Sequence, residues 1–228
     1  MIPIATQYRH EWKHEINAAD LMALRARLRT VLRPDSHGNN GKYVIRSLYF
    51  DDLWDTALRQ KIDGVDRRDK FRIRLYDMDT GVIRLEKKSK RGGLCRKVSA
   101  PLTAEEAQSI VDGRIEWMAE SSEPLLQELY HQMTARILRP KTIVDYTREA
   151  FTYGPGNVRV TLDYHIRTGL KCTDLLNADC LTVPVKDDPV ILEVKWDEFL
   201  PDIVRDAVQL RDRHAAAFSK YAACRMYD

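Results

Sequence analysis

Several segments of the chain alternate charged and apolar side chains, which is the pattern of a half-buried β-strand. The clearest are residues 9–15, 70–76 and 82–90, and residues 43–51, 142–151, 158–166 and 190–196 continue the strand theme. Two consecutive glycines at 92–93 predict a tight turn that pairs the strand at 82–90 with a further one ending at residue 100. The pattern is typical of antiparallel sheet.

Helical periodicity interrupts these strands. Asn17 is a suitable N-cap for a helix whose leucines recur on one face and which ends before Pro34. Thr103 and Glu106 form a capping-box signature for a second helix. Further helices are predicted at residues 53–61, 123–137 and 202–217.

The two patterns together predict how the layers are arranged. For one strand alone, a charged face turned to water is the ordinary explanation. Here the helices must pack their apolar faces against the apolar faces of the same strands. The charged faces of the strands therefore all lie on the side of the sheet away from the helices. The expected fold is therefore α+β: a closed antiparallel β-barrel of about eight strands, with the helices packed outside and the charges inside. We expect one domain, residues 1–228, because no linker or repeat divides the chain.

Charge then indicates what such an interior binds. The net charge of +3 is too small for a general nucleic-acid binder. Enclosed cations are costly unless they are neutralised, and the predicted interior acids Glu11, Glu86, Asp163 and Glu193 offset only part of that cost. The remainder favours a polyanion, and the planar fork of arginine suits phosphate.

The four cysteines are scattered without zinc-ligand spacing, so we interpret them as reduced thiols. No basic and apolar leader is evident near Met1, and no apolar run approaches the roughly 18 residues of a membrane span. We expect a cytoplasmic protein that has no membrane span in this chain and binds no nucleic acid.

Eight short motifs occur in one order along the chain: residues 9–13 (RHEWK), 47–51 (SLYFD), 71–74 (FRIR), 85–88 (LEKK), 146–148 (YTR), 159–163 (RVTLD), 192–195 (LEVK) and 219–221 (SKY). Together they resemble the vacuolar transporter chaperone (VTC) domain, the polyphosphate polymerase branch of the triphosphate tunnel metalloenzymes, also called CYTH-like proteins. The resemblance covers residues 9–221. It implies a tunnel that binds ATP and inorganic polyphosphate and transfers the γ-phosphoryl group of ATP to the growing polymer.

The resemblance also implies the site residues. Its catalytic basic positions fall on Lys13, Arg72, Arg74, Lys88, Arg148, Arg159 and Lys220. It also implies substrate-binding roles for Tyr146, Ser219 and the hairpin residue Lys97. We further predict that Arg9, Lys90 and Lys195, on the charged faces of their strands, bind substrate. For the hairpin position Arg96 is an alternative to Lys97. The metal ligand is Glu193, which would hold Mn²⁺ or Mg²⁺ together with water and substrate phosphates.

Elementary chemistry bears on several of these assignments. Arg72 and Arg74 stand two apart on a strand and therefore point to the same side. For Glu193 an internal salt bridge, for example to Lys195, is the competing interpretation. Glu11 and Asp163 are expected to orient neighbouring cations.

Four aromatic residues are expected to have no catalytic role. His10 and His14 fall on the face opposite Lys13, and Trp12 and Trp196 are expected between the barrel and the helices.

Two other functions remain open. One is a tunnel enzyme that hydrolyses triphosphates or tripolyphosphate, and the other is a non-catalytic module that binds polyphosphate or inositol phosphates. Glu193 argues against the module, because anion binding alone needs no metal ligand. Residue types do not separate polymerase from hydrolase, and the sequence leaves room for a membrane-protein partner.

Overall fold

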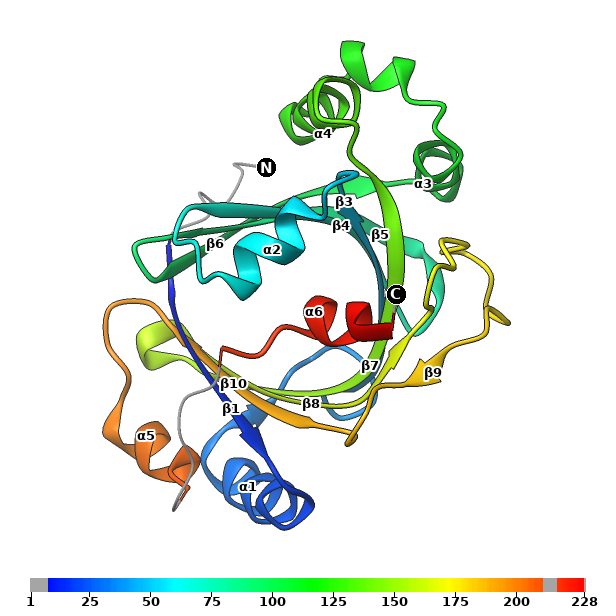
Figure 1. Cartoon of the computed structure of the whole chain (residues 1–228). Helices are drawn as coiled ribbons and strands as arrows, with labels where there is room; N and C mark the ends of the chain where they lie inside the picture. Colours follow the sequence, from blue (N-terminus) through cyan, green and yellow to red (C-terminus); the bar gives the residue numbers. More distant parts are fainter. Residues whose placement is uncertain (1–7, 211–216, 228) are drawn as a thin grey trace.

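The computed structural model describes residues 8–210 and 217–227. Eight strands form one antiparallel sheet that curls around a central space, in the order β1-β10-β8-β7-β3-β4-β5-β6 (Figure 1). These strands are β1 (His10–Ile16), β3 (Lys42–Asp51), β4 (Arg68–Tyr76), β5 (Asp79–Arg91), β6 (Leu94–Leu102), β7 (Arg139–Tyr153), β8 (Val158–Thr168) and β10 (Val190–Trp196). Two-residue strands, β2 (Arg33–Pro34) and β9 (Val183–Pro184), pair with β7 and β8.

The predicted closure of the barrel is wrong in part. The end strands β1 and β6 meet at a single bridge in the described part of the chain, between Arg9 and Cys95, whose two N–O distances are 2.9 and 3.0 Å. The structure is thus a curled, open sheet rather than a fully closed barrel. Alternation of side chains fixes which face points inward, but closure also depends on strand tilt and stagger, which that pattern does not encode.

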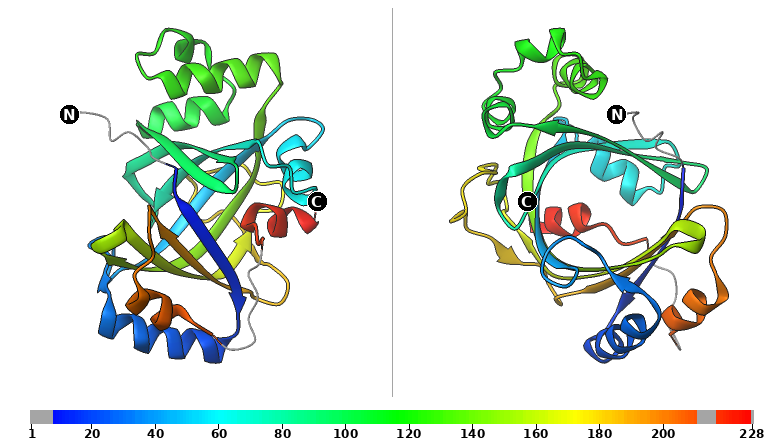
Figure 2. Two further views of the ribbon diagram at one scale, coloured as in Figure 1. Left: turned by 90° about the vertical axis from the view of Figure 1, so that its left-hand side faces the viewer. Right: turned by 180° about the vertical axis from the view of Figure 1, so that it is seen from behind.

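The apolar faces of the strands lie outside, as predicted. On β4, Phe71, Ile73 and Leu75 are buried in a cluster that also contains residues of α3 (Ala104–Val111) and α4 (Pro124–Ala135). A second cluster joins β8 and β10 to α1 (Ala18–Val31) and α5 (Asp202–Val208). These four helices cover the outside of the sheet (Figures 1 and 2). The predicted capping box of Thr103 with Glu106 is present, and the predicted N-cap Asn17 forms a capping box of its own with Asp20.

Two helices depart from the prediction that all helices pack outside. Both α2 (Thr56–Ile62) and α6 (Lys220–Cys224) lie at one end of the curled sheet (Figure 2). Ser219 caps α6 by accepting a hydrogen bond from the N–H of Ala222 at 3.3 Å. We call this the α2 end of the molecule.

The helix predicted for residues 202–217 is shorter than expected, because α5 stops at Val208, and residues 211–216 lie outside the described part of the chain. Single 3₁₀ turns complete the structure: η1 (Glu116–Glu120), η2 (Pro155–Asn157) and η3 (Arg225–Tyr227). None of the helices within residues 8–210 and 217–227 combines the length and apolar character needed to cross a bilayer.

Candidate functional site

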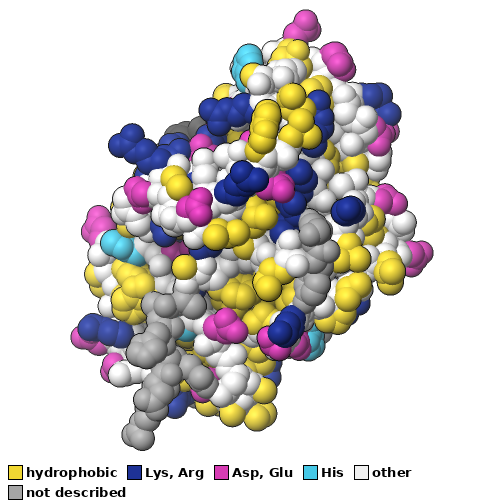
Figure 3. Space-filling model, viewed as in Figure 1, with side chains coloured by type: hydrophobic (Ala, Val, Ile, Leu, Met, Phe, Trp, Pro, Cys, Tyr) yellow, Lys and Arg dark blue, Asp and Glu magenta, His cyan; other side chains and the backbone are white. Residues whose placement is uncertain are grey.

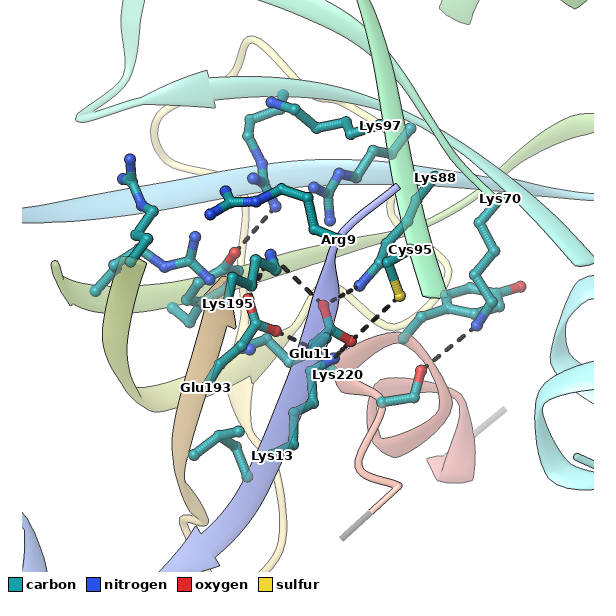
Figure 4. A pocket seen from close by; sticks show the side chains of 18 of the residues that line it. Arg9, Glu11, Lys13, Lys70, Lys88, Cys95, Lys97, Glu193, Lys195 and Lys220 are labelled. Atoms are coloured by element: carbon teal, nitrogen blue, oxygen red, sulfur yellow. Dashed lines mark hydrogen bonds and ion pairs between the residues drawn. The ribbon is translucent and has the colours of Figure 1, made fainter. Parts of the chain in front are cut away.

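A central cavity of about 920 Å³ lies within the curled sheet (Figure 4). Its lining includes Arg68 and Tyr76, the two ends of β4, so the cavity runs the length of that strand, about 26 Å at 3.3 Å per residue. Sixteen Lys and Arg residues line it against five Asp and Glu. Since the whole chain carries only +3, the cationic excess is concentrated here. Figure 3 shows Lys and Arg mixed with Asp and Glu on the outer surface.

The structure brings all fourteen sequence-predicted site residues to this cavity. Twelve of them come from β1 and the residue before it, β4, β5, β6, β7, β8 and β10, and the other two are the N-cap and the first residue of α6. The residues are Arg9, Lys13, Arg72, Arg74, Lys88, Lys90, Lys97, Tyr146, Arg148, Arg159, Glu193, Lys195, Ser219 and Lys220. Arg96, the alternative to Lys97, lines the cavity as well.

Glu193 and Glu11 form the acidic centre of the cavity, on the adjacent strands β10 and β1 (Figure 4). Lys13 bridges them, with its Nζ 3.1 Å from a carboxylate oxygen of each. Lys195 lies 2.6 Å from Glu193, and Lys88 lies 2.7 Å from Glu11. The competing interpretation of Glu193 as a salt-bridge partner of Lys195 is therefore also realised in this structure.

The charges of this centre support one another. Burial alone would raise the pKa of Glu193, yet Lys195, Lys13 and Lys88 hold that pKa well below its usual range. For Glu11, burial and repulsion by Glu193 oppose ionisation, and Lys88 and Lys13 outweigh them, so its pKa is lowered as well. Conversely, Glu193 and Glu11 raise the pKa of Lys13 despite its burial. All three groups are ionised at neutral pH.

Two further buried carboxylates hold the arginines. Asp163 accepts hydrogen bonds from Arg148 at 2.7 and 2.8 Å and from Lys220 at 2.6 Å, as the sequence predicted for an orienting acid. Burial would raise the pKa of Asp163, but Arg148 and Lys220 lower it to about 2.

Glu86, on β5, does the same for the arginines of β4. It pairs with Arg72 at 2.6 Å, with Lys97 at 2.8 Å and more distantly with Arg74 at 3.6 Å. Burial opposes its ionisation, but Arg72, Arg74 and Lys97 hold the pKa of Glu86 well below the usual value.

Tyrosine rings form the other part of the lining. Tyr146 accepts a hydrogen bond from Arg74 at 2.9 Å, and Lys220 and Arg148 lie 4.6 and 5.4 Å from its ring centroid. Tyr49 accepts from Arg72 at 2.8 Å and stacks on Tyr221, with the ring centroids 5.0 Å apart. The ring contacts of Lys220 and Arg148 are cation–π geometries, and together with the two hydrogen bonds they fix the directions of the cations.

Sequence reasoning missed several lining residues. Tyr43 and Tyr49, six apart on one strand, share its inward face, and that spacing was the available signal. Lys70 alternates with Arg72 and Arg74 but has no counterpart in the family motifs. Lys61 and Arg68 lie in segments without alternation, so no sequence pattern identified them.

The donor chemistry fits the predicted divalent ion. Mg²⁺ and Mn²⁺ prefer carboxylate oxygen and commonly bind through one or two carboxylates plus substrate phosphates. Glu193 and Glu11 supply two neighbouring carboxylates, both contacting Lys13. Among the described residues no group of three or more His, Cys, Asp and Glu forms a metal cage. The site can therefore hold an ion only together with phosphate or water oxygens.

The remaining aromatic predictions concern residues outside the cavity. His10 stacks on Trp196 with centroids 5.2 Å apart, and Trp196 is buried in the cluster beside α5. Trp12 packs edge-on against Trp196 but is 39% exposed, so its predicted burial under the helices is wrong. His14 is half-buried, and burial lowers its pKa.

All four cysteines are free thiols. Cys95 lies on β6 and Cys224 in α6, whereas Cys172 and Cys180 lie in the loop after β8 with their sulfurs 2.7 Å apart.

The sequence matches the VTC domain family over residues 8–227. The chain belongs to the VTC domain family. No curated protein matches the sequence. Among solved structures, it is similar to an adenylyl-cyclase-like protein of Hippeastrum with a dominant triphosphatase activity, at 14% identity and a TM-score of 0.57, covering 96% of this chain and 95% of that one.

Two further structures are similar. An adenylate-cyclase-like protein of Bacillus halodurans is 13% identical with a TM-score of 0.52, covering 84% of this chain and 82% of that one. The PH1012 protein of Pyrococcus horikoshii OT3 is 12% identical with a TM-score of 0.52, covering 93% and 96%. At these identities the likeness shows the fold alone.

Proposed function

We propose that this VTC domain is a polyphosphate polymerase, which transfers the γ-phosphoryl group of ATP to a growing polyphosphate chain. The observation that carries the proposal is the elongated central cavity, lined by sixteen cations of which eight pair with four buried carboxylates. Phosphoryl transfer needs mainly in-line positioning and cations where charge accumulates. The family match supplies the polymerase direction.

In this proposal each group of cations has its own role. The arginines Arg72, Arg74 and Arg148 grip the phosphates of ATP, because their guanidinium forks match phosphate oxygens and their directions are fixed by Glu86, Asp163 and Tyr146. The terminal oxygen of polyphosphate forms a bond to the γ-phosphorus, the bond from that phosphorus to the β–γ bridging oxygen breaks, and ADP leaves.

Lys13, Lys88 and Lys195 bind the phosphates nearest the acidic centre. Since these lysines now pair with Glu11 and Glu193, entry of substrate exchanges carboxylate contacts for phosphate contacts. Glu193, with Glu11 beside it, would then hold Mn²⁺ or Mg²⁺. A bound ion there supplies charge neutralisation at the phosphate oxygens.

Hydrolysis of triphosphates is the second candidate. The triphosphatase activity of the Hippeastrum protein, which shares the fold, favours it. The difference between the two reactions is the acceptor: an elongated cavity that admits a polymer along its length favours the polymer over water as acceptor. A binding module without turnover is the third outcome.

One experiment separates these functions. The purified protein is incubated with ATP and Mn²⁺ or Mg²⁺, and ADP, free phosphate and polymer are measured separately. The polymerase yields ADP with a polymer that a polyphosphate-specific phosphatase destroys, and a short polyphosphate primer shortens any lag. ADP with an equal amount of free phosphate and no polymer establishes a hydrolase. Tight polyphosphate binding without either product establishes a binding module.

A further inference from the structure

Four cations gather at the α2 end of the central cavity. Arg68 and Lys70 begin β4, Lys90 stands near the end of the neighbouring β5, and Lys61 lies in the last turn of α2. Strands β4 and β5 are paired so that Arg68 lies opposite Lys90. Only Lys90 is among the site residues predicted from the sequence.

This group differs from the rest of the lining in its counter-charges. Lys13, Lys88, Lys195, Arg72 and Arg148 each pair with a buried carboxylate. Within residues 8–210 and 217–227, no carboxylate lies at ion-pair distance from Lys61, Arg68, Lys70 or Lys90. Two of them instead donate to backbone carbonyls, Lys61 to Ala217 and Arg68 to Val65. Four like charges line one end of a cavity without neutralisation, which is costly unless an anion occupies it.

Lys70 is half-buried and lies against the segment that leads into α6. Its Nζ lies 3.5 Å from the hydroxyl of Ser219 and 5.1 Å from the ring centroid of Tyr221, both on the α6 side. The contact with Ser219 links the four cations to the segment that carries Lys220. A phosphate held by Lys70 therefore lies next to the predicted substrate site.

The charges that face Lys70 come from four elements. Burial and repulsion by Lys61 of α2, Arg68 of β4 and Lys88 of β5 lower the pKa of Lys70 to about 7, against an opposing attraction from Asp51 of β3. Burial, Arg68, Lys13 and Lys90 similarly lower the pKa of Lys61 to about 8. An entering anion reverses this balance and favours the protonated form of both lysines.

We propose that Lys61, Arg68, Lys70 and Lys90 form a polyphosphate-binding subsite at the α2 end of the cavity, in which Lys70 takes up a proton as the phosphates enter. The inference deepens the proposed function and rests on it for the identity of the polyanion. Its consequence is that the affinity for polyphosphate depends on pH. Binding weakens as the pH rises above 7, because the free protein must then be protonated for the complex to form.

The test is calorimetric titration with linear polyphosphate long enough to span the cavity, in buffers of different protonation enthalpy. Lys70→Arg keeps the charge but cannot titrate. At pH 8 the wild-type protein is expected to take up about one proton more per binding event than Lys70→Arg. Between pH 7 and pH 9 its Kd should rise at least about tenfold more than that of the variant. Equal proton uptake by the two proteins overturns the proposal.

Lys70→Met tests the charge itself. It should weaken polyphosphate binding at pH 7 about tenfold, whereas Lys171→Met, which removes an exposed cation from a loop outside the cavity, should leave Kd unchanged. An equal loss of polyphosphate affinity in both variants means that only the net charge of the protein matters. Unchanged affinity in Lys70→Met means that the subsite does not exist. Should Lys70→Met not fold, Lys90→Met at the half-exposed rim takes its place with the same expectations.

These measurements record binding and protons, not turnover. Proton uptake that depends on Lys70 in a protein that makes no polymer leaves the subsite standing and removes the polymerase proposal. Polymer synthesis with equal proton uptake in wild type and Lys70→Arg supports the polymerase proposal and removes the subsite.

Discussion

At the scale of single residues, the buried acids fix the positions of the cations that line the cavity. Asp163, Glu86 and Glu193 each hold two or more cations at fixed positions. Without them, cations enclosed this closely would repel one another and lose hydration. The acids thus pre-organise the cations at a cost in net charge, and the four cations of the α2 end remain without this arrangement.

Asp163→Asn tests this role through stability. The side chain of Asp163 is fully buried, and its loss leaves Arg148 and Lys220 without their counter-charge, so the free energy of unfolding at pH 7 should fall by about 3–5 kcal/mol. Because the folded pKa of about 2 lies below the ordinary aspartate pKa of 3.8, the stabilising effect of Asp163 is complete above pH 4 and is lost as the pH falls toward 2. Denaturant unfolding of both proteins from pH 7 to pH 2 should show the difference narrowing. A constant difference across this range contradicts the assignment.

Glu193→Gln separates metal binding from anion binding. Gln keeps the size of the side chain but loses the charge, so metal-dependent turnover should fall at least about 100-fold while polyphosphate still binds. Turnover over a Mn²⁺ titration and calorimetry with polyphosphate are the two measurements. Glu198→Gln, an exposed change after β10 outside the cavity lining, is the matched control. Undiminished turnover in Glu193→Gln rules that residue out as the ligand.

Alternation made much of the residue-scale site predictable. The period of two placed Arg72 and Arg74 on the face where the structure has them, since side-chain direction along a strand is a local property. The partners of each cation were not predictable in the same way. Asp163 meets Lys220 across 57 positions of sequence, and such a contact depends on the curl of the sheet and on α6.

At the scale of elements, one carboxylate joins three segments at the α2 end. Asp51, at the end of β3, accepts hydrogen bonds from the N–H groups of Ala57 and Leu58 in α2 at 2.8 and 3.0 Å, and from the hydroxyl of Tyr221 in α6 at 2.8 Å. Tyr221 in turn accepts from Arg225 at 2.7 Å. This connection holds α6, and with it Ser219 and Lys220, against the cavity.

Tyr221→Phe removes only the hydroxyl from this connection. One net hydrogen bond is worth about 1 kcal/mol, so amides of α6 should exchange hydrogen about five- to tenfold faster. The KM for ATP should rise, because Lys220 is held less firmly. Hydrogen exchange measured over residues 217–227 and steady-state kinetics check the two effects. Tyr130→Phe, the same chemical change in α4 outside the cavity, should alter neither the exchange rates nor the KM. Unchanged hydrogen exchange of α6 in Tyr221→Phe contradicts the proposed role of the connection through Asp51.

Helix prediction shows the limit of sequence reasoning at this scale. The 14-residue α1 was predictable because its apolar face and its Asn17 cap are both local signals. The five-residue α6 is too short to show a period, and its stability comes from contacts with Asp51 and Tyr49 rather than from its own sequence. For the same reason Lys220 was placed through a family motif and not through its element.

At the scale of the whole molecule, the seam between the end strands β1 and β6 opens into the cationic cavity. In the described part of the chain these two edges are joined by one bridge, between Arg9 and Cys95, and both residues line the cavity. A sheet that is not fully closed can widen at its seam without breaking a continuous row of interstrand hydrogen bonds.

The net charge of +3 does not reveal the strongly cationic interior, because Asp and Glu on the outer surface offset the Lys and Arg that line the cavity. Total composition therefore could not predict the site, whereas the alternation of charge along strands could.

Affinity for polyphosphate should depend on chain length and salt in a way that reflects this geometry. Each additional phosphate meets further lining cations, so Kd should fall with length until the chain spans the roughly 26 Å of the cavity, and then level off. Raising the ionic strength should weaken long chains more than tripolyphosphate, because more ionic contacts are screened. Calorimetry over a series of polyphosphate lengths at two salt concentrations measures both effects. Duplex DNA of equal total charge is the control: it cannot enter an interior of this size and should compete poorly. If DNA competes for polyphosphate binding as well as unlabelled polyphosphate does, the binding surface lies outside the cavity. A Kd that keeps falling for chains much longer than the cavity would also place the binding surface outside it.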